Sequence, residues 1–194
     1  EEQLRTFYSC LYRTLLFPRE FYEFDAQGKP VYYSPYNGKI QDGYMYTDNG
    51  FWDTFRAVHP LFTLLYPEVS ERVTQSILNA YDESGFMPEW ASPGHRECMI
   101  GNNSISLLTD AWMKGIRTIC PEKALEAMIH QTEARHPGIS SVGRDGFGYY
   151  DRLGYVPYPE VHEATAKTLE YAYADWCVAR FADSIVGIVK VPVV

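Results

Sequence analysis

Residues 50–60 place an aromatic side chain next to a carboxylate at the start of a predicted helix. These are Trp52 and Asp53, which follow a Tyr- and Gly-rich segment without sustained periodicity. A carboxylate can accept two hydrogen bonds from sugar hydroxyls, and an indole face can pack on the C–H face of a pyranose ring. The alternative is structural: Trp52 and Phe55 are core residues, and Asp53 stabilises the positive end of the helix. The stretch alone leaves both interpretations open.

Further carboxylates lie in loops beside later helices. Glycoside hydrolysis needs two carboxyl groups, one as proton donor and one as nucleophile or base. Each carboxylate could instead cap a helix or lie in solvent. The candidates are Asp53, Glu89, Glu97, Glu160 and Glu163.

Other chemistries find weaker support. His95 and His162 could bind a metal together with Glu97 and Glu163, but their spacing matches no standard ligand motif, and we identify no metal ligands. No serine lies in a GxSxG context, and no phosphate-binding glycine loop is present. Lys167 and Arg56 lie near helix starts and are expected to pair with acidic residues there.

The elements that must position these residues are mainly helices. Apolar spacing and Pro or Gly boundaries predict helices over residues 2–17, 49–65, 68–84, 102–115, 121–136 and 163–182, with Asp48 as a plausible N-cap of the second. Long loops precede the second, fourth and sixth helices. If the helices stack in antiparallel pairs, these loops gather at one end, as in an α/α toroid or solenoid, and function lies at that end. The expected fold class is therefore all-α.

Length and charge narrow the function classes. A chain of 194 residues has room for one domain with a sizeable core, and a net charge of −8 argues against a nucleic-acid partner. No membrane-spanning run or signal peptide is found in this chain. The four cysteines form no CxxC pair and are expected to be free, buried thiols. Residues 184–194 form a β-branched, apolar tail that does not continue the helical pattern.

Four motifs in order along the chain resemble glycoside hydrolase family 92, a family of exo-acting α-mannosidases. The resemblance covers roughly residues 3–182. The motifs are Gly-Phe-Trp-Asp-Thr-Phe-Arg at 50–56 with His-Pro at 59–60, Met-Pro-Glu-Trp at 87–90 with Met-Ile-Gly at 99–101, Asp-Ala-Trp-Met-Lys-Gly at 110–115, and Lys-Thr-Leu-Glu-Tyr-Ala-Tyr-Ala-Asp-Trp at 167–176.

The resemblance implies a fold and an activity. The family has an N-terminal β-sandwich followed by an (α/α)6 barrel, and its members are calcium-dependent, inverting enzymes that act on mannose-containing glycans. Matched to the family, Trp52 and Asp53 belong to the terminal-mannose subsite. We add Glu97 and Glu163 as substrate-binding candidates. The resemblance also implies a bacterial, periplasmic or secreted protein.

The departures limit the expected activity. The family's general acid, its base and its calcium-contacting loop lie in motifs that do not occur in this sequence, so no catalytic residue is assigned here. We expect residues 1–183 to be the first half of the barrel, from an enzyme of α-1,2 type. We also expect exposed helix faces that promote self-association. The alternatives are a non-catalytic carbohydrate-binding or structural helical domain, and an unrelated enzyme that uses Glu89, Glu97 or Glu163 as its acid–base pair.

Overall fold

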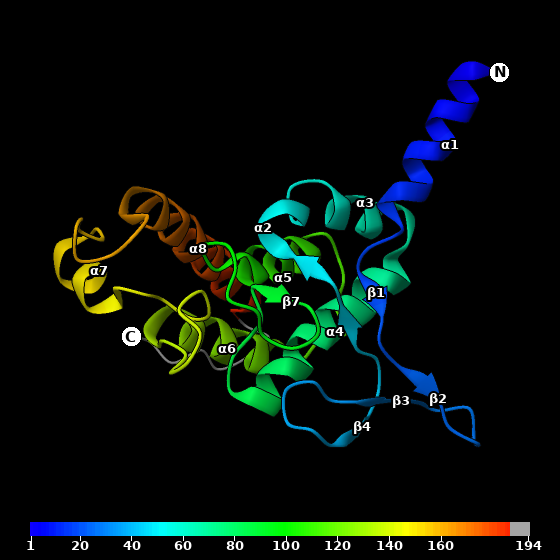
Figure 1. Cartoon of the computed structure of the whole chain (residues 1–194), viewed down its shortest axis with the longest axis horizontal. Coiled ribbons are helices and arrows are strands. Elements are labelled where there is room, and N and C mark those ends of the chain that lie inside the picture. The colour runs from blue at the N-terminus through cyan, green and yellow to red at the C-terminus, as the bar shows by residue number, and fades with distance from the viewer. Residues whose placement is uncertain (187–194) are drawn as a thin grey trace.

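The computed structural model describes residues 1–186, and most of these residues are helical (Figure 1). Four helices make up the body of the molecule, and four others are shorter or lie at its periphery. The body helices are α4 (Pro67–Ser84), α5 (Asn103–Met113), α6 (Pro121–Glu133) and α8 (Ala164–Ile185). The others are α1 (Glu2–Thr14), α2 (Phe51–Thr54), α3 (Val58–Leu65) and α7 (Phe147–Leu153).

Seven short strands form three small antiparallel sheets. The first sheet pairs β1 (Arg19–Glu20) with β5 (Tyr46–Thr47), and the second has the order β2 (Glu23–Phe24), β3 (Pro30–Tyr33), β4 (Ile40–Asp42). The third pairs β6 (Asn49–Gly50) with β7 (Trp90–Ala91). The prediction of a helical domain is confirmed, with these small sheets added to it.

Helix α5 occupies the centre of the core. Most of its residues are buried, and it packs against α2, α3, α4 and α8. Near its end, the rings of Trp112 and Phe181 lie 5.3 Å apart, which joins α5 to α8. A helix that is buried on nearly every side needs partners for its polar groups as well as for its apolar ones.

A buried polar cluster supplies those partners at the start of α5. Glu89 is only 2% exposed, and its carboxylate accepts hydrogen bonds from the Ser104 hydroxyl at 2.9 Å and the Ser104 backbone N–H at 3.2 Å. Gln131 of α6 donates to the same carboxylate at 3.0 Å and also bonds both backbone groups of Met87. This Glu89 cluster (Met87, Glu89, Ser104 and Gln131) therefore joins the 86–91 segment, α5 and α6.

The β6–β7 pair brings residues 49–52 against the same segment. Gly50 lies opposite Trp90, and a Cβ atom on Gly50 would come within 2.3 Å of the Trp90 ring. Because only a residue without a side chain leaves room for that ring, Gly50 fixes how α2 begins. Phe51 then enters the core directly, at 3% exposure.

The prediction of one continuous helix over residues 49–65 is wrong. It is broken into α2 and α3, with Ala57 as the residue before α3. Asp48 is not the N-cap. Its φ is +57°, and its carboxylate pairs with Arg19 at 3.4 Å and accepts from the Ser92 hydroxyl at 3.1 Å. Asp48 therefore bonds to residues that are distant in sequence and does not cap the helix.

Three further expectations need correction. The first helix ends at Thr14 rather than near residue 17, and none of its residues is buried, so it projects from the body (Figure 1). Helix α7 lies inside the segment that we expected to be a loop. Of the four free cysteines only Cys177 is buried, whereas Cys10 and Cys120 are exposed. The predicted tail falls mostly outside the described residues, which end at 186.

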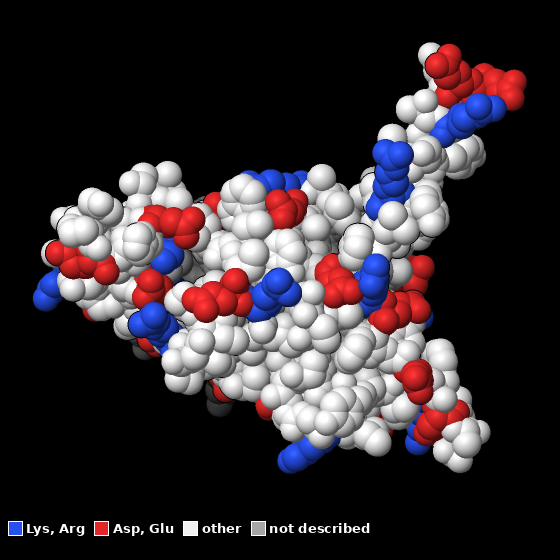
Figure 2. Space-filling view, viewed as in Figure 1, with Lys and Arg blue, Asp and Glu red and all other residues white. Residues whose placement is uncertain are grey.

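The surface shows no strong separation of charge on the face seen in Figure 2. Acidic and basic side chains are interspersed there, with broad areas of uncharged residues between them. Among residues 1–186, no helix combines the length and apolar character needed to cross a membrane.

The Glu89 cluster predicts a pH-dependent stability. Burial raises the pKa of Glu89 to about 8, although the hydrogen bonds from Ser104 and Gln131 oppose the shift. Between the unfolded pKa near 4.3 and the folded value, the native state holds a proton that the unfolded chain has lost. Stability from this group is therefore present at low pH and lost as the pH rises through that window, with a slope of up to about 1.4 kcal/mol per pH unit.

Glu89→Gln should remove this slope, because an amide does not titrate in that range. Urea unfolding at several pH values from about 5 to about 8 measures it. Glu160→Gln, which changes an exposed carboxyl, is the matched control. If the unfolding free energies of Glu89→Gln and the parent protein depended equally on pH, Glu89 would not be the group responsible.

Candidate functional site

Trp52 is held at the surface of the molecule by a side chain from α8. Its indole N–H donates to Glu170 Oε1 at 2.9 Å, across 118 residues of chain. Arg56 also approaches Glu170, at 3.8 Å, and its guanidinium lies 4.7 Å from the Trp52 ring centroid. One face of the indole is therefore covered by Arg56, and a ligand would have to use the remaining accessible part of the ring.

The geometry of residues 50–56 supports parts of both interpretations, because Asp53 lies in the first turn of α2 and Phe55 packs against the core. Phe51, and not Trp52, is the buried residue of α2, and Trp52 stays half-buried. Asp53 is exposed and makes no ion pair within residues 1–186. The pair thus presents a carboxylate and part of an indole to solvent, as a sugar-binding surface requires.

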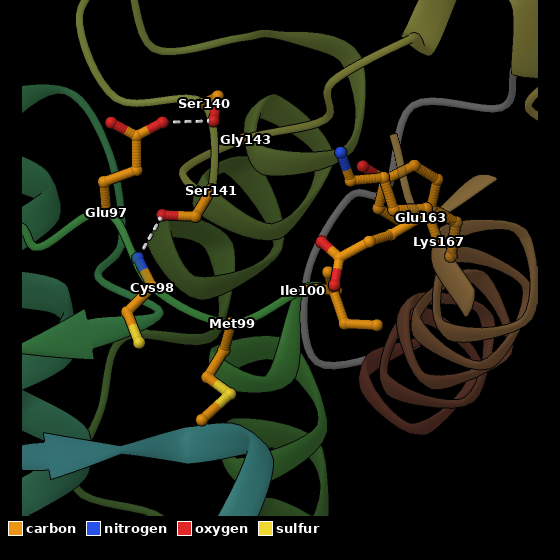
Figure 3. A pocket seen from close by; sticks show the side chains of 11 residues that line it. Glu97, Cys98, Met99, Ile100, Ser140, Ser141, Gly143, Glu163 and Lys167 are labelled. Atoms are coloured by element: carbon orange, nitrogen blue, oxygen red, sulfur yellow. Dashed lines mark hydrogen bonds between the residues drawn. The ribbon is translucent and has the colours of Figure 1, made fainter. Parts of the chain in front are cut away.

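A cavity that includes Gly101 is lined by the two other substrate-binding candidates, Glu97 and Glu163. It is a cavity of about 250 Å³, and Figure 3 shows Glu97 on one side, with Glu163 and Lys167 on the other. The residues that line this cavity are Glu97, Cys98, Met99, Ile100, Gly101, Ser140, Ser141, Gly143, Glu163, Lys167 and Tyr171.

Two lining residues have unusual backbone geometry. Met99 has φ +66° and Glu163 has φ +56°, in the left-handed region that side chains other than those of Gly, Asn and Asp rarely adopt. Such strain costs of order 1–3 kcal/mol and persists only where the surroundings enforce it. Glu163 is also the residue that precedes α8, so its conformation determines how the chain enters that helix.

Arg144 ties the loop that forms one wall of the cavity to the helices. Its side chain is 3% exposed, donates to Asn102 Oδ1 at 2.9 Å and to the Tyr171 carbonyl at 3.2 Å, and pairs with Asp175. The loop in turn carries Ser140, which donates to the Glu97 carboxylate (Figure 3). A buried arginine with three hydrogen-bond partners therefore holds the wall against α5 and α8.

The basic residues near the cavity are paired, as expected. Lys167 lies with its side chain 10% exposed and donates to Asp145 at 3.1 Å. Arg135 approaches the same carboxylate at 3.3 Å. With Arg56 beside Glu170, this confirms that Lys167 and Arg56 pair with acidic residues, although Glu170 lies inside α8 and not at its start.

Gly101, which lines the cavity, lies close to Glu170, whose carboxylate bonds Trp52. Gly101 has φ +84°, and a Cβ atom there would come 2.9 Å from the Glu170 Cβ and 3.0 Å from Asn103 Nδ2. Glycine at this position lets α8 approach closely enough for Glu170 to reach Trp52. One tightly packed contact therefore connects a residue of the cavity lining to the residue that bonds the indole.

The described residues do not form a calcium site. Ca²⁺ takes six to eight oxygen ligands, several of them carboxylates. Within residues 1–186, no group of three or more His, Cys, Asp or Glu side chains is arranged to hold a metal ion. His95 contacts other residues than Glu97. Its ring forms a hydrogen bond with the Ser84 hydroxyl at 2.8 Å and lies 5.4 Å from the His136 ring.

Two outcomes depart from the residue-level expectations. Glu89 cannot face a cleft as an acid–base candidate, because it is buried and bonded inside the core. Glu170 was not singled out, although it lies in one of the four motifs. One signal in the sequence marks Glu170 as a candidate. It lies about one helical turn after Lys167, among apolar and aromatic residues of the same helix.

Comparisons with known proteins agree with the four motifs. Residues 1–187 match the model of the glycosyl hydrolase family 92 catalytic domain. An uncharacterized secreted glycosidase of Arthroderma benhamiae is 24% identical over 184 residues, covering 90% of this chain and 19% of its own length.

Solved structures give the same result. An inverting mannosidase of family 92 from Bacteroides thetaiotaomicron is 86% identical, with a TM-score of 0.93 over 94% of this chain. An α-mannosidase of the same family and species is 33% identical with a TM-score of 0.81, again over 94% of this chain. The structure of its complex with mannoimidazole is 34% identical in sequence, with a TM-score of 0.78 over 93% of this chain.

The chain spans 25%, 24% and 23% of the lengths of these three solved chains. The match of the family model over nearly all of the sequence, together with the fold and the ordered motifs, decides the classification. This chain belongs to glycosyl hydrolase family 92.

Proposed function

We propose that this chain supplies part of the sugar-binding surface of an α-mannosidase that removes terminal mannose from glycans. The observation that carries the proposal is the pairing of Trp52 with Glu170, which keeps the indole at the surface beside the exposed Asp53. The mannosidase relatives, one of them complexed with mannoimidazole, support mannose as the sugar. Glu97 and Glu163 extend the surface into the adjoining cavity.

The proposal includes details that follow from the family resemblance. They are an inverting mechanism, action on α-1,2 linkages, calcium assistance in the longer enzyme, and a place for residues 1–183 as the first half of an (α/α)6 barrel. The inverting relative that is 86% identical supports the stereochemistry. We place the general acid, the base and the calcium ligands in parts of that longer enzyme beyond this chain.

The alternative is a non-catalytic carbohydrate-binding or structural helical domain that keeps the same surface. For location, we propose a secreted or periplasmic protein. The description of the Arthroderma benhamiae relative as a secreted glycosidase supports secretion.

Mannose binding should depend on Asp53. We expect methyl α-mannoside to change the tryptophan emission of the protein, and Asp53→Ala to weaken that response by at least about tenfold, since a carboxylate-assisted hydrogen bond contributes roughly 1.5–3 kcal/mol. Fluorescence titration measures both. Trp52→Phe identifies the reporter, and Asp151→Ala, an exposed carboxylate on α7, is the control. A sugar that produces no emission change and no heat of binding would refute the proposed surface.

A second candidate function is favoured by the shared cavity of Glu97 and Glu163. Glu97 and Glu163 line one cavity from opposite sides, and two carboxyl groups are the residue types that glycoside hydrolysis requires. Turnover of an aryl α-mannoside by this protein, abolished by Glu97→Gln or Glu163→Gln, would establish it. Under the principal proposal, the protein shows no turnover with or without calcium.

We also propose self-association through the outer face of α8. Leu169, Tyr173 and Trp176 are 68%, 40% and 58% exposed, and the last two rings stack at 6.1 Å. Contiguous exposed apolar surface favours association. Sedimentation velocity should show a concentration-dependent dimer that Trp176→Glu weakens and Leu153→Glu, a change of an exposed leucine on α7, leaves intact. A monomer at all concentrations would exclude it.

A further inference from the structure

We infer that His59 is a positioning residue for the Trp52–Asp53 surface, because it holds, through Asn49, the single helical turn that carries both side chains. The inference rests on the proposed function and extends it to a residue that does not itself belong to the exposed surface. His59 belongs to the His-Pro pair at 59–60, the part of the first motif that has no other role in the proposed surface.

Helix α2 cannot hold Trp52 and Asp53 in place unaided. It has four residues, and no side chain caps its N-terminus. Helices this short are not stable by themselves in water, because the cost of ordering the first turn is not recovered. Glu170 fixes the indole of Trp52, whereas Asp53 is exposed and makes no ion pair within residues 1–186. The direction of the Asp53 carboxylate therefore depends on what holds the backbone of this turn.

Asn49 connects the turn to the elements before and after it. The hydroxyl of Thr54, the last residue of α2, lies 2.9 Å from Asn49 Oδ1 and 3.0 Å from the Gly50 carbonyl oxygen. Asn49 belongs to β6, which precedes the turn, and is 4% exposed. Its Nδ2 lies 2.9 Å from Nε2 of His59, near the start of α3. One amide side chain therefore joins β6, the end of α2 and the start of α3.

His59 is the fixed end of this connection. It is 4% exposed, and its ring centroid lies 6.1 Å from that of Phe51 and 5.7 Å from that of Phe62. Helix α3, which carries His59, packs in turn against α4 and α5. The imidazole thus contacts α2 by two routes, an apolar one through Phe51 and a polar one through Asn49. Because both polar partners are buried, water competes little for the bond between them.

The bond to Asn49 requires a neutral imidazole with its proton on Nδ1. When the Thr54 hydroxyl donates to Asn49 Oδ1, the amide N–H of Asn49 donates to His59 Nε2. Burial lowers the pKa of His59 to about 3, so the ring is neutral above about pH 5. Nδ1 is buried and has no hydrogen-bond partner within residues 1–186, which lowers stability. The benefit of a histidine at this position therefore lies in its bond to Asn49.

Isothermal titration calorimetry with methyl α-mannoside on the whole chain tests the inference. His59→Leu removes the acceptor but keeps a similar volume, and we expect it to weaken binding about tenfold. His59→Gln, whose side-chain oxygen can accept from Asn49, should restore the affinity to within about threefold of the parent protein. Thr54→Val breaks the other end of the connection at a half-buried position and should also weaken binding. Met128→Ala, in the core of α6, is the matched control, which should lower stability and leave the affinity unchanged.

A double-mutant cycle separates positioning from a general loss of structure. If His59 acts on the sugar through Asp53, His59→Leu should have less than about a twofold further effect once Asp53→Ala is present. Effects of the two changes that simply multiply would assign the loss of affinity to the fold and overturn the inference.

Amide hydrogen exchange monitors the turn without any sugar. Exchange over residues 51–55 should be faster in His59→Leu and Thr54→Val than in the parent protein and in His59→Gln, with exchange in α6 unchanged. Unchanged exchange over residues 51–55 in His59→Leu would overturn the inference, as would equal losses of affinity in His59→Leu and His59→Gln. If the parent protein binds no mannoside, the proposed surface is wrong, and exchange still decides whether His59 holds α2. If circular dichroism shows that His59→Leu is unfolded, Thr54→Val decides.

Discussion

The architecture depends on a carboxyl group that has been removed from water. Glu89 is enclosed where the 86–91 segment meets α5 and α6, and its oxygens accept from Ser104 and Gln131. Leaving such a group without partners would cost several kcal/mol, so the three segments can pack together only in an arrangement that completes these bonds. Because α5 in turn packs against α8, this buried group also determines where the cavity-lining residues before α5 lie relative to Glu170 of α8, which bonds Trp52.

The long helices could be predicted from sequence because their signals are local. Apolar spacing, Pro67 and Pro121 at helix starts and Gly85 after α4 are all visible along the chain, and each has its expected role. The break between α2 and α3 was missed because residues 49–65 are apolar enough to suggest one continuous helix. Asp48 was misassigned because the side chains that engage it, Arg19 and Ser92, are distant in sequence.

The candidate site was predictable in part for the same reason. Glu97 and Glu163 each precede a long helix, and since α5 and α8 pack together, the loops before them meet at one cavity. The contact between Trp52 and Glu170 could not be found by spacing, because 118 residues separate them. Glu89 shows the opposite problem: a carboxylate in a loop beside an aromatic residue suggests chemistry, and only tertiary packing shows that it belongs to the core.

The close approach of Gly101 to Glu170 has a consequence for reading related sequences. Any side chain at position 101 would collide with the Cβ of Glu170 and the amide of Asn103, in a backbone conformation that already favours glycine. A homologue with a larger residue at this point therefore cannot retain the same α5–α8 spacing or the same support for its tryptophan. We therefore expect a glycine at this position wherever a related chain keeps the hydrogen bond between the equivalents of Glu170 and Trp52.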